Sequence, residues 1–279
     1  MEVVKIINDE LNTLFEIKTD DGYTIESVHY RKTLCVSSQV GCSIKCSFCA
    51  SGLNGLIRNL SFDEIVNQYL MVKEKGYEIE SIAFAGIGEP LLNWDNVKQA
   101  FDYFKSQGLS VSFYTTGFPI SNFKQLLTLN HDGVNLSLHS VFEEKRKSLI
   151  PNSHTISQLI QVFKDHIQHL SNRKKKLYNI AYILIYGEND SYEEIDKLGE
   201  IAKELGIGIS LLKYNEIEFF PYKSVPDDRY EELFLRLREK GIRVTLSNKY
   251  RTRKIGGCGT LMVNRLELLS SSTFVKLYN

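Results

Sequence analysis

The 279-residue sequence lacks the features that carry a protein into or across a membrane. No apolar run approaches the roughly 20 residues that a helix needs to span a bilayer. The charged start, MEVVKIINDE, has no signal-peptide core. We therefore expect a protein that works in the cytoplasm.

Net charge and linkers are also missing. The 34 basic residues balance 34 acidic ones, so charge gives no general argument for nucleic-acid binding. Two basic runs, residues 173–176 (RKKK) and 249–254 (KYRTRK), are exceptions, although such short runs are usually solvated surface. No repeat, low-complexity tract or Pro/Gly-rich stretch divides the chain, whose length allows one large domain or two smaller ones.

Cysteine is scarce, and its distribution is uneven. An odd total of five fits poorly with an extracellular disulfide framework. Three of the five, Cys42, Cys46 and Cys49, stand within the stretch VGCSIKCSFCASG. The spacing C-x3-C-x2-C can hold three irons of a [4Fe–4S] cluster and leaves the fourth iron open to an external ligand. Phe48, between two of the ligands, is placed to shield such a cluster from water.

A structural zinc site is the alternative for these cysteines. It would need Cys35, Cys258 or a histidine to complete a tetrahedron. Zinc ligands more often come as two separated C-x2-C pairs, so the spacing favours the iron–sulfur cluster. A catalytic cysteine nucleophile is a weaker alternative still.

Short apolar strands alternate with amphipathic helices along most of the chain. Residues 14–18 and 23–30 alternate apolar and polar residues across a turn, which predicts an N-terminal β-hairpin. Further strands are expected at residues 33–38, 81–87, 109–115, 133–139, 179–185, 208–214 and 242–247.

Two of the intervening helices, residues 61–76 and 191–206, begin with a capping-box pattern and end in glycine. Regular alternation of strand and helix predicts a parallel sheet with right-handed crossovers. About six such units indicate an α/β fold, an open partial (β/α)6 barrel with an N-terminal β-hairpin extension. The expected division is extension 1–30, core 31–262 and C-terminal tail 263–279.

Unusual polar residues follow the ends of these strands. In βα barrels the functional residues gather where the C-terminal ends of the strands converge, so we expect one shared rim. The segment AGIGEP (85–90) is one of these strand ends, and its glycines let the backbone approach a ligand closely. Pro90 and the missing third glycine argue against a dinucleotide fingerprint. The other strand-end features are Cys42–Cys49, Tyr114–Thr116, Ser137–His139, Asn215 and Cys258. Five further histidines without a partner pattern are expected at the surface: His29, His131, His154, His166 and His169.

Four segments together resemble the RlmN/Cfr family of radical S-adenosylmethionine (SAM) RNA adenosine methyltransferases. They are TLCVSSQVGCSIKCSFCASGLNGLIRNLSFDEI (33–65), GIGEPLLNWDNV (86–97), LSLHS (136–140) and GGCGTL (256–261). The resemblance runs from about Asp20 to Met262. Family members usually carry a further N-terminal domain, and this chain is expected to be a short member that lacks it.

The resemblance implies a radical-SAM barrel with two cofactors. These are a [4Fe–4S] cluster on Cys42, Cys46 and Cys49, and SAM bound to the open iron. The implied enzyme methylates an adenine carbon, C2 or C8, in tRNA or rRNA through a methylcysteine. A flavodoxin- or ferredoxin-type protein would supply the electron.

The resemblance also implies the roles of single residues. Cys258 would carry the methyl group, Cys35 would release the product by forming a disulfide, and Glu26 would be the base that removes the ring proton. Basic neighbours would favour the thiolate of Cys258: Arg251, Arg253 and Lys254. Tyr114 stands where a small hydroxyl residue would be expected in the SAM pocket. The other implied SAM-pocket residues are Gly88, Glu89, Ser137, Leu138, His139 and Asn215.

Two other functions stay open from the sequence. The same radical chemistry would serve a peptide, a nucleotide or another small molecule instead of RNA, and zero net charge leaves room for this alternative. A non-catalytic, metal-stabilised binding protein is the second alternative, although a binder has no need of two further thiols and a SAM pocket.

Overall fold

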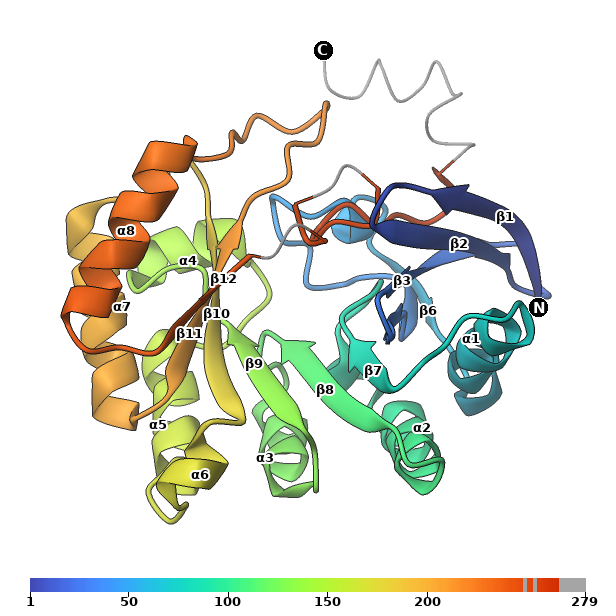
Figure 1. Ribbon diagram of the computed structural model, residues 1–279, viewed down its shortest axis with the longest axis horizontal. Helices are drawn as coiled ribbons and strands as arrows, with labels where there is room; N and C mark the ends of the chain where they lie inside the picture. The colour runs from blue at the N-terminus through green and yellow to red at the C-terminus, as the bar shows by residue number, and fades with distance from the viewer. Residues whose placement is uncertain (248–249, 253–254, 266–279) are drawn as a thin grey trace.

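The computed structural model describes residues 1–247, 250–252 and 255–265, and in this part of the chain ten strands form one curved, open sheet (Figure 1). The strand order is β1-β2-β3-β4-β7-β8-β9-β10-β11-β12. From β4 onward each strand pairs in parallel with the next. These parallel strands are β4 (Thr33–Val36), β7 (Ser81–Phe84), β8 (Ser110–Thr115), β9 (Gly133–Ser137), β10 (Tyr178–Leu184), β11 (Gly208–Lys213) and β12 (Val244–Leu246). The predicted open, partial barrel is confirmed, and each of the seven core strands lies where the sequence predicts it.

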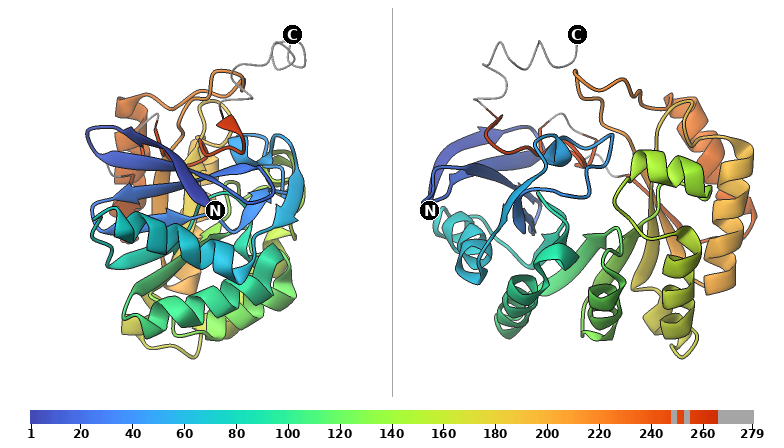
Figure 2. Two further views of the ribbon diagram at one scale, coloured as in Figure 1. Left: turned by 90° about the vertical axis from the view of Figure 1, so that its right-hand side faces the viewer. Right: turned by 180° about the vertical axis from the view of Figure 1, so that it is seen from behind.

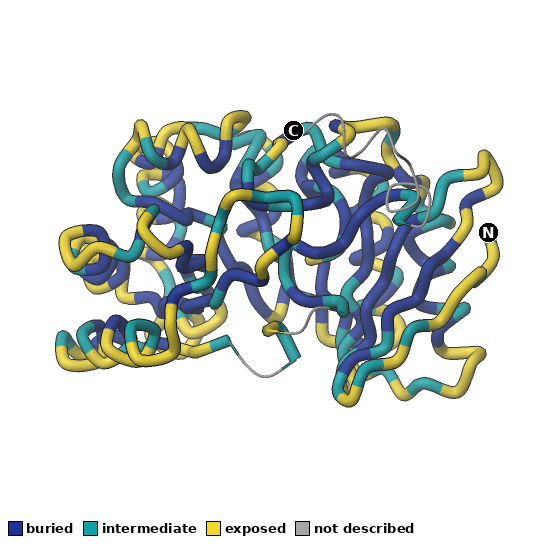
Figure 3. The backbone as a smooth tube through the Cα atoms, turned by 90° about the horizontal axis from the view of Figure 1, so that it is seen from above, coloured by how far each residue is buried: buried dark blue, intermediate teal, exposed yellow. Residues whose placement is uncertain are grey.

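Helices cover the outer face of the parallel strands (Figures 1 and 2). They are α1 (Phe62–Glu74), α2 (Trp94–Ser106), α3 (Ile120–Thr128), α4 (Glu143–Leu149), α5 (Ile156–Ile167), α6 (Asn172–Lys175), α7 (Tyr192–Leu205) and α8 (Asp227–Glu239). Seen from above, the strands are mostly buried and the outer turns of the helices are exposed (Figure 3). The basic run 173–176 lies on α6 and its C-terminal cap, just before β10 begins.

The two predicted capping boxes differ in the structure. At α1, the Ser61 hydroxyl accepts a hydrogen bond from the Glu64 N–H at 3.2 Å, and the Glu64 carboxylate accepts one from the Ser61 N–H at 2.9 Å. At α7, the Ser191 hydroxyl caps the Glu194 N–H at 3.2 Å, but the Glu194 carboxylate instead accepts from Tyr182 Oη at 2.7 Å. The second box is therefore half formed, because a buried donor takes its carboxylate.

The N-terminal extension has three antiparallel strands, one more than predicted. The hairpin of β2 (Asn12–Lys18) and β3 (Thr24–Tyr30) is present, and β1 (Glu2–Asn8) adds to its outer edge. On the inner side, β3 pairs antiparallel with β4. The sheet thus continues from the extension into the parallel strands. The domain boundaries at residues 30 and 262 stay a prediction.

The core lies on both faces of the parallel strands, and two histidines that were expected at the surface are buried. His131 is only 4% exposed, and its Nε2 lies 3.1 Å from Tyr178 Oη. His29 is also buried, with Nε2 2.9 Å from the Glu78 carbonyl oxygen. In both cases a hydrogen-bond partner far along the chain offsets the free-energy cost of burying the polar ring. No helix within the described residues combines the length and apolar character needed to span a membrane.

Candidate active site

A small second sheet carries the three clustered cysteines. Its two antiparallel strands, β5 (Gln39–Gly41) and β6 (Leu56–Asn59), enter and leave the loop that holds Cys42, Cys46 and Cys49. The loop closes through a hydrogen bond from the Cys42 N–H to the Gly55 carbonyl oxygen at 2.9 Å. We call residues 42–55 the cysteine loop.

Glycine is required where the cysteine loop begins. Gly41 has a left-handed backbone with φ +82°, and a Cβ atom there would lie 2.0 Å from the carbonyl oxygen of Gly55. No side chain fits at that distance, so the glycine before Cys42 lets the two ends of the loop meet.

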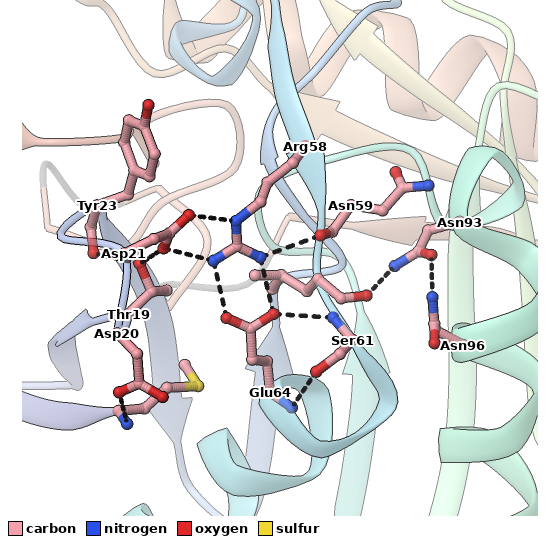
Figure 4. Close-up of polar contacts among 12 residues, drawn as sticks. Thr19, Asp20, Asp21, Tyr23, Arg58, Asn59, Ser61, Glu64, Asn93 and Asn96 are labelled. Carbon is pink, nitrogen blue, oxygen red and sulfur yellow. Dashed lines mark hydrogen bonds and ion pairs between the residues drawn. The ribbon is translucent and has the colours of Figure 1, made fainter.

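An ion-pair network fixes the strand on which the loop ends (Figure 4). The Arg58 guanidinium on β6 donates to both carboxylate oxygens of Asp21, each at 2.6 Å, and to both of Glu64, each at 2.8 Å. Hydrogen bonds from Arg58 hold the pKa of Asp21 well below its usual range. Arg58 therefore joins the β2–β3 turn and the start of α1 to the cysteine loop.

The donor set and its surroundings fit an iron–sulfur cluster. Burial raises the pKa of Cys42 to about 12 and that of Cys46 well above its ordinary value, and the neighbouring cysteine charges add to both increases. Three crowded thiolates need compensating positive charge, which iron supplies. Among the described residues, no group of three or more His, Cys, Asp or Glu side chains is arranged to hold a single metal ion. The C-x3-C-x2-C spacing of these three ligands favours a cluster over zinc.

A cavity of about 190 Å³ lies beside the cysteine loop, at the C-terminal ends of the parallel strands. Seven of the thirteen residues predicted to bind the cluster, to bind SAM or to act in catalysis line it: Cys35, Cys46, Cys49, Tyr114, Ser137, His139 and Cys258. The structure thus brings both separate thiols and two of the clustered ones to one space. Six other predicted residues, all of them described, do not line it: Glu26, Cys42, Gly88, Glu89, Leu138 and Asn215.

Glu89 and Gly88 support the cavity from behind its wall. The Glu89 carboxylate, 3% exposed, accepts hydrogen bonds from Thr115 Oγ1 at 2.5 Å and from the Thr116 N–H at 2.8 Å. It thereby ties the segment after β7 to the end of β8. Gly88 has φ +106°, and a Cβ atom there would lie 2.7 Å from Gln39 Cβ. Their predicted contact with SAM stays a prediction.

His139 is a neutral hydrogen-bond donor toward the cavity. Its Nδ1 accepts from the Ile183 N–H at 3.1 Å, so the proton of the neutral ring is on Nε2. Burial, with a further contribution from Arg146, lowers the pKa of His139 to about 3. The edge of the ring packs against Phe48 at a centroid distance of 5.3 Å. Leu138 is fully buried in the main core.

A glycine-rich loop holds Cys258 over the cavity. Asn215 Nδ2 donates to the carbonyl oxygens of Arg251 at 2.8 Å and of Cys258 at 3.0 Å. The Ala50 N–H donates to the Gly259 carbonyl oxygen at 2.9 Å, which joins this loop to the cysteine loop. We call residues 255–265 the carrier segment.

Arg251 is a cation whose charge interacts with Cys258. Its guanidinium lies over the Tyr114 ring, 4.9 Å from the centroid. Burial opposes the charge of Arg251, but Tyr114 and Cys258 outweigh it and raise its pKa, so the guanidinium stays charged. Arg253 and Lys254, the other two predicted cations, lie outside the described residues.

Cys35 faces the carrier segment from the other side. It pairs in register with Val28 of β3, and Gly256 packs on Val28 so closely that a Cβ atom would lie 2.7 Å from Val28 Cγ1. Burial, reinforced by the charge of Cys258, raises the pKa of Cys35 to about 12. Cys35 is therefore a neutral thiol at neutral pH.

Comparison with known proteins identifies the family. A model of the radical SAM superfamily matches residues 36–199. A probable dual-specificity RNA methyltransferase RlmN of Chlorobium phaeobacteroides is 33% identical over 272 residues, which cover 91% of this chain and 74% of that protein. The protein of the same name from Aquifex aeolicus is 35% identical over 283 residues, or 93% and 78% of the two chains. This chain belongs to the RlmN family.

Solved structures agree with the radical SAM fold. A radical SAM methyltransferase from Sphaerobacter thermophilus superposes with a TM-score of 0.84 at 26% identity, covering 93% of this chain and 80% of that one. Streptococcus suis SuiB, solved with S-adenosylmethionine bound, has a TM-score of 0.60 at 17% identity and covers 79% and 51% of the two chains. SuiB supports the fold alone.

Glu26, the predicted base, does not line the cavity. It is fully buried on β3, and its carboxylate accepts hydrogen bonds from the Met262 N–H at 2.8 Å and from Arg265. Burial raises the pKa of Glu26, and the paired Arg265 opposes this increase. Its role as a base stays a prediction, and here the carboxylate holds the carrier segment.

Arg146 is a site residue that the sequence analysis missed. It is 1% exposed and donates to the carbonyl oxygens of Leu138 at 2.6 Å and Thr116 at 3.3 Å, so it joins the ends of β8 and β9. Its charge opposes the rise in the pKa of Cys46 that burial causes. In the sequence it stands in an ordinary charged helix, EEKRKSL, with no signal of burial.

Proposed function

We propose that this protein is a radical SAM methyltransferase that methylates an adenine carbon, C2 or C8, in tRNA or rRNA through a methylcysteine at Cys258. Its cofactors are a [4Fe–4S] cluster and SAM, as in the radical SAM family to which it belongs. The curated relatives are named as dual-specificity RNA methyltransferases, which supports tRNA or rRNA as the substrate class.

One observation carries the proposal. Cys35, Cys258 and two thiols of the cysteine loop line a single cavity. A cluster alone does not require two further thiols, whereas methyl transfer through a cysteine requires one thiol to carry the group and another to release the product.

The cluster and SAM supply the methyl group and a 5′-deoxyadenosyl radical when they are bound. The chain's own residues prepare the thiols for this chemistry. Arg251 places a positive charge beside Cys258, the thiol proposed to accept the methyl group. Burial raises the pKa of Cys35, so its thiol is neutral in the resting protein and must lose its proton before it attacks Cys258.

Other residues shape the space for SAM and the adenine. His139 offers its Nε2 proton to a ligand oxygen, and apolar side chains such as Leu212 and Ile183 keep water out of the cavity. The predicted SAM pocket then has Tyr114 and Ser137 in its wall. Adenine enters most readily from an unpaired stretch of RNA, where flipping costs little.

We place the reaction in the cytoplasm, where thiols stay reduced. A flavodoxin- or ferredoxin-type donor is the proposed source of the electron that cleaves SAM. Five free cysteines in the structure are consistent with a reducing compartment.

The test uses cluster-loaded protein, SAM and reductant without oxygen. Mass spectrometry of the peptide that contains Cys258 is expected to show the gain of one methylene. Added RNA is then expected to yield methylated adenosine after digestion, and Cys258→Ala is expected to abolish both signals.

Cys35→Ala separates the two thiol roles. Methylation of Cys258 is expected to persist, while RNA stays covalently attached to the protein and turnover stops. 5′-Deoxyadenosine without a methyl group on Cys258 would contradict the carrier mechanism. A methylated Cys258 with no methylated adenosine from any RNA pool would contradict the substrate class.

A further inference from the structure

The carrier segment rests on the N-terminal strands (Figures 1 and 2). On one flank of Cys258, Asn12 Nδ2 of β2 donates to the carbonyl oxygens of Tyr250 at 2.7 Å and Ile255 at 3.0 Å. Asn12 is 2% exposed, so these bonds form away from water. The chain that leads to Cys258 is thus held in place by β2.

On the other flank, β3 holds the chain after Cys258. The Asn264 N–H donates to the Thr24 carbonyl oxygen at 3.0 Å, and the Thr24 N–H donates to Asn264 Oδ1 at 2.7 Å. Glu26 accepts from the Met262 N–H at 2.8 Å and from Arg265, whose Nη2 also donates to the Thr260 carbonyl oxygen at 2.8 Å. The ion pair thereby binds three points of the carrier segment to one strand.

We propose that Glu26 and Arg265 are a positioning pair that sets the encounter between Cys258 and Cys35. The inference rests on the proposed function, because it assumes that these two thiols must meet. Glu26 acts here through Arg265 and Met262, and it does not line the cavity.

The geometry of β3 explains why this pair controls the distance between the thiols. Val28 lies two residues from Glu26 on the same face of β3 and pairs in register with Cys35. Gly256, two residues before Cys258, packs directly on Val28. Cys35 is therefore held by β3 through the sheet, while Cys258 is held by β3 through the ion pair and Gly256.

Removing only one partner of the Glu26–Arg265 ion pair is also energetically unfavourable. Glu26 is fully buried, and the Arg265 side chain is 17% exposed. Removing one partner leaves the other charge without compensation in a buried setting, which favours release of the carrier segment. The glycines around Cys258 offer no stiffness of their own to hold it in place.

The experiment measures the equilibrium of the two thiols in cluster-loaded protein without SAM or RNA. In glutathione buffers, Cys35 and Cys258 lose two protons and two electrons to oxidised glutathione, which gives one disulfide and two reduced glutathione molecules. Differential alkylation and mass spectrometry of the two peptides give the fraction oxidised. Arg265→Met and Glu26→Gln are expected to lower the equilibrium constant at least tenfold, which corresponds to about 30 mV.

The matched control is Arg236→Met. Arg236 also donates two hydrogen bonds, each 2.7 Å long, to one carboxylate, Asp196, but it lies on α8. The control is expected to leave the equilibrium unchanged, and Arg265→Lys is expected to restore part of it. Thermal unfolding verifies that each variant is folded, and Arg265→Gln replaces Arg265→Met if the latter is not.

Two results would overturn the inference. The first is a thiol–disulfide equilibrium constant in the folded Arg265 variant that equals that of the unchanged protein. This result would show that the ion pair has no positioning role, and it would not affect the proposal that Cys258 carries the methyl group. Absence of any Cys35–Cys258 disulfide in the unchanged protein would instead remove the pairing of thiols on which the proposed function depends.

Discussion

At the scale of single residues, the site depends on glycine as much as on cysteine. Gly41 permits the approach of Gly55 that closes the cysteine loop, and Gly256 permits the approach of the carrier segment to Val28. Both have left-handed backbones, at φ +82° and φ +71°. A cysteine in the right sequence position is useful only if the backbone beside it can take these conformations.

Gly41→Ala is expected to destabilise the protein and to reduce the iron it retains. A left-handed backbone costs a non-glycine residue about 1–2 kcal/mol, and the overlap with the Gly55 carbonyl oxygen adds to this. Urea unfolding and iron content after reconstitution measure the two effects. Gly22→Ala is the matched control, because Gly22 has φ +93° but no atom within 4 Å of the Cβ position. Equal losses in the two variants would contradict the steric argument.

Some site residues could be predicted from the sequence and others could not. Cys42, Cys46 and Cys49 could, because local spacing alone marks metal ligands. The partner of Glu26 could not, since Arg265 lies 239 positions away and no periodicity links the two. Burial of Arg146 was equally hidden, because its helix reads as solvent-exposed.

At the scale of elements, Arg58 joins three parts of the chain that the sequence analysis treated separately. The β2–β3 turn, the exit of the cysteine loop and the start of α1 meet at its guanidinium (Figure 4). Folding of the cysteine loop is thereby coupled to the N-terminal extension.

This junction predicts an acid-sensitive contribution to stability. The folded pKa of Asp21 is lowered by Arg58, so its stabilisation is present above the unfolded pKa of about 4 and is lost as the pH falls below it. Arg58→Met is expected to cost about 1 kcal/mol at pH 7, given the partial exposure of the pair. The loss is expected to shrink toward pH 2 in urea titrations. Arg58→Lys, which keeps the charge, is expected to cost less, and a loss that is independent of pH would argue against the ion pair.

The elements themselves were mostly predictable. All seven core strands read as apolar runs between turn signals, and the Ser61–Glu64 box marks the start of α1. The strand β1 was missed because neither of its faces is consistently buried. The Ser191–Glu194 box is half formed because Tyr182, a residue of another strand, competes for the carboxylate.

At the scale of the whole molecule, one sheet combines antiparallel and parallel strand pairs. Antiparallel β1 to β4 form one end, and the parallel strands β4 to β12 form the rest. The two edges, β1 and β12, do not pair with one another in the described part of the chain, so the barrel stays open.

The sheet predicts a gradient of local stability. Amide hydrogen exchange is expected to be slowest in the central strands β8, β9 and β10 and fastest in β1, an edge strand with mostly exposed side chains. Exchange followed by mass spectrometry of peptic peptides measures this gradient. Protection of β1 equal to that of β9 would indicate that its outer edge is covered in solution.

The carrier segment covers the cavity, and the order in which the chain is synthesised gives this arrangement a further consequence. The cysteine loop follows the first parallel strand, β4, whereas the carrier segment follows the last, β12. During synthesis the three thiols of the cysteine loop therefore leave the ribosome before the carrier segment that covers the cavity. We expect iron and sulfide to reach the cysteine loop most easily during that interval, before the carrier segment covers the cavity.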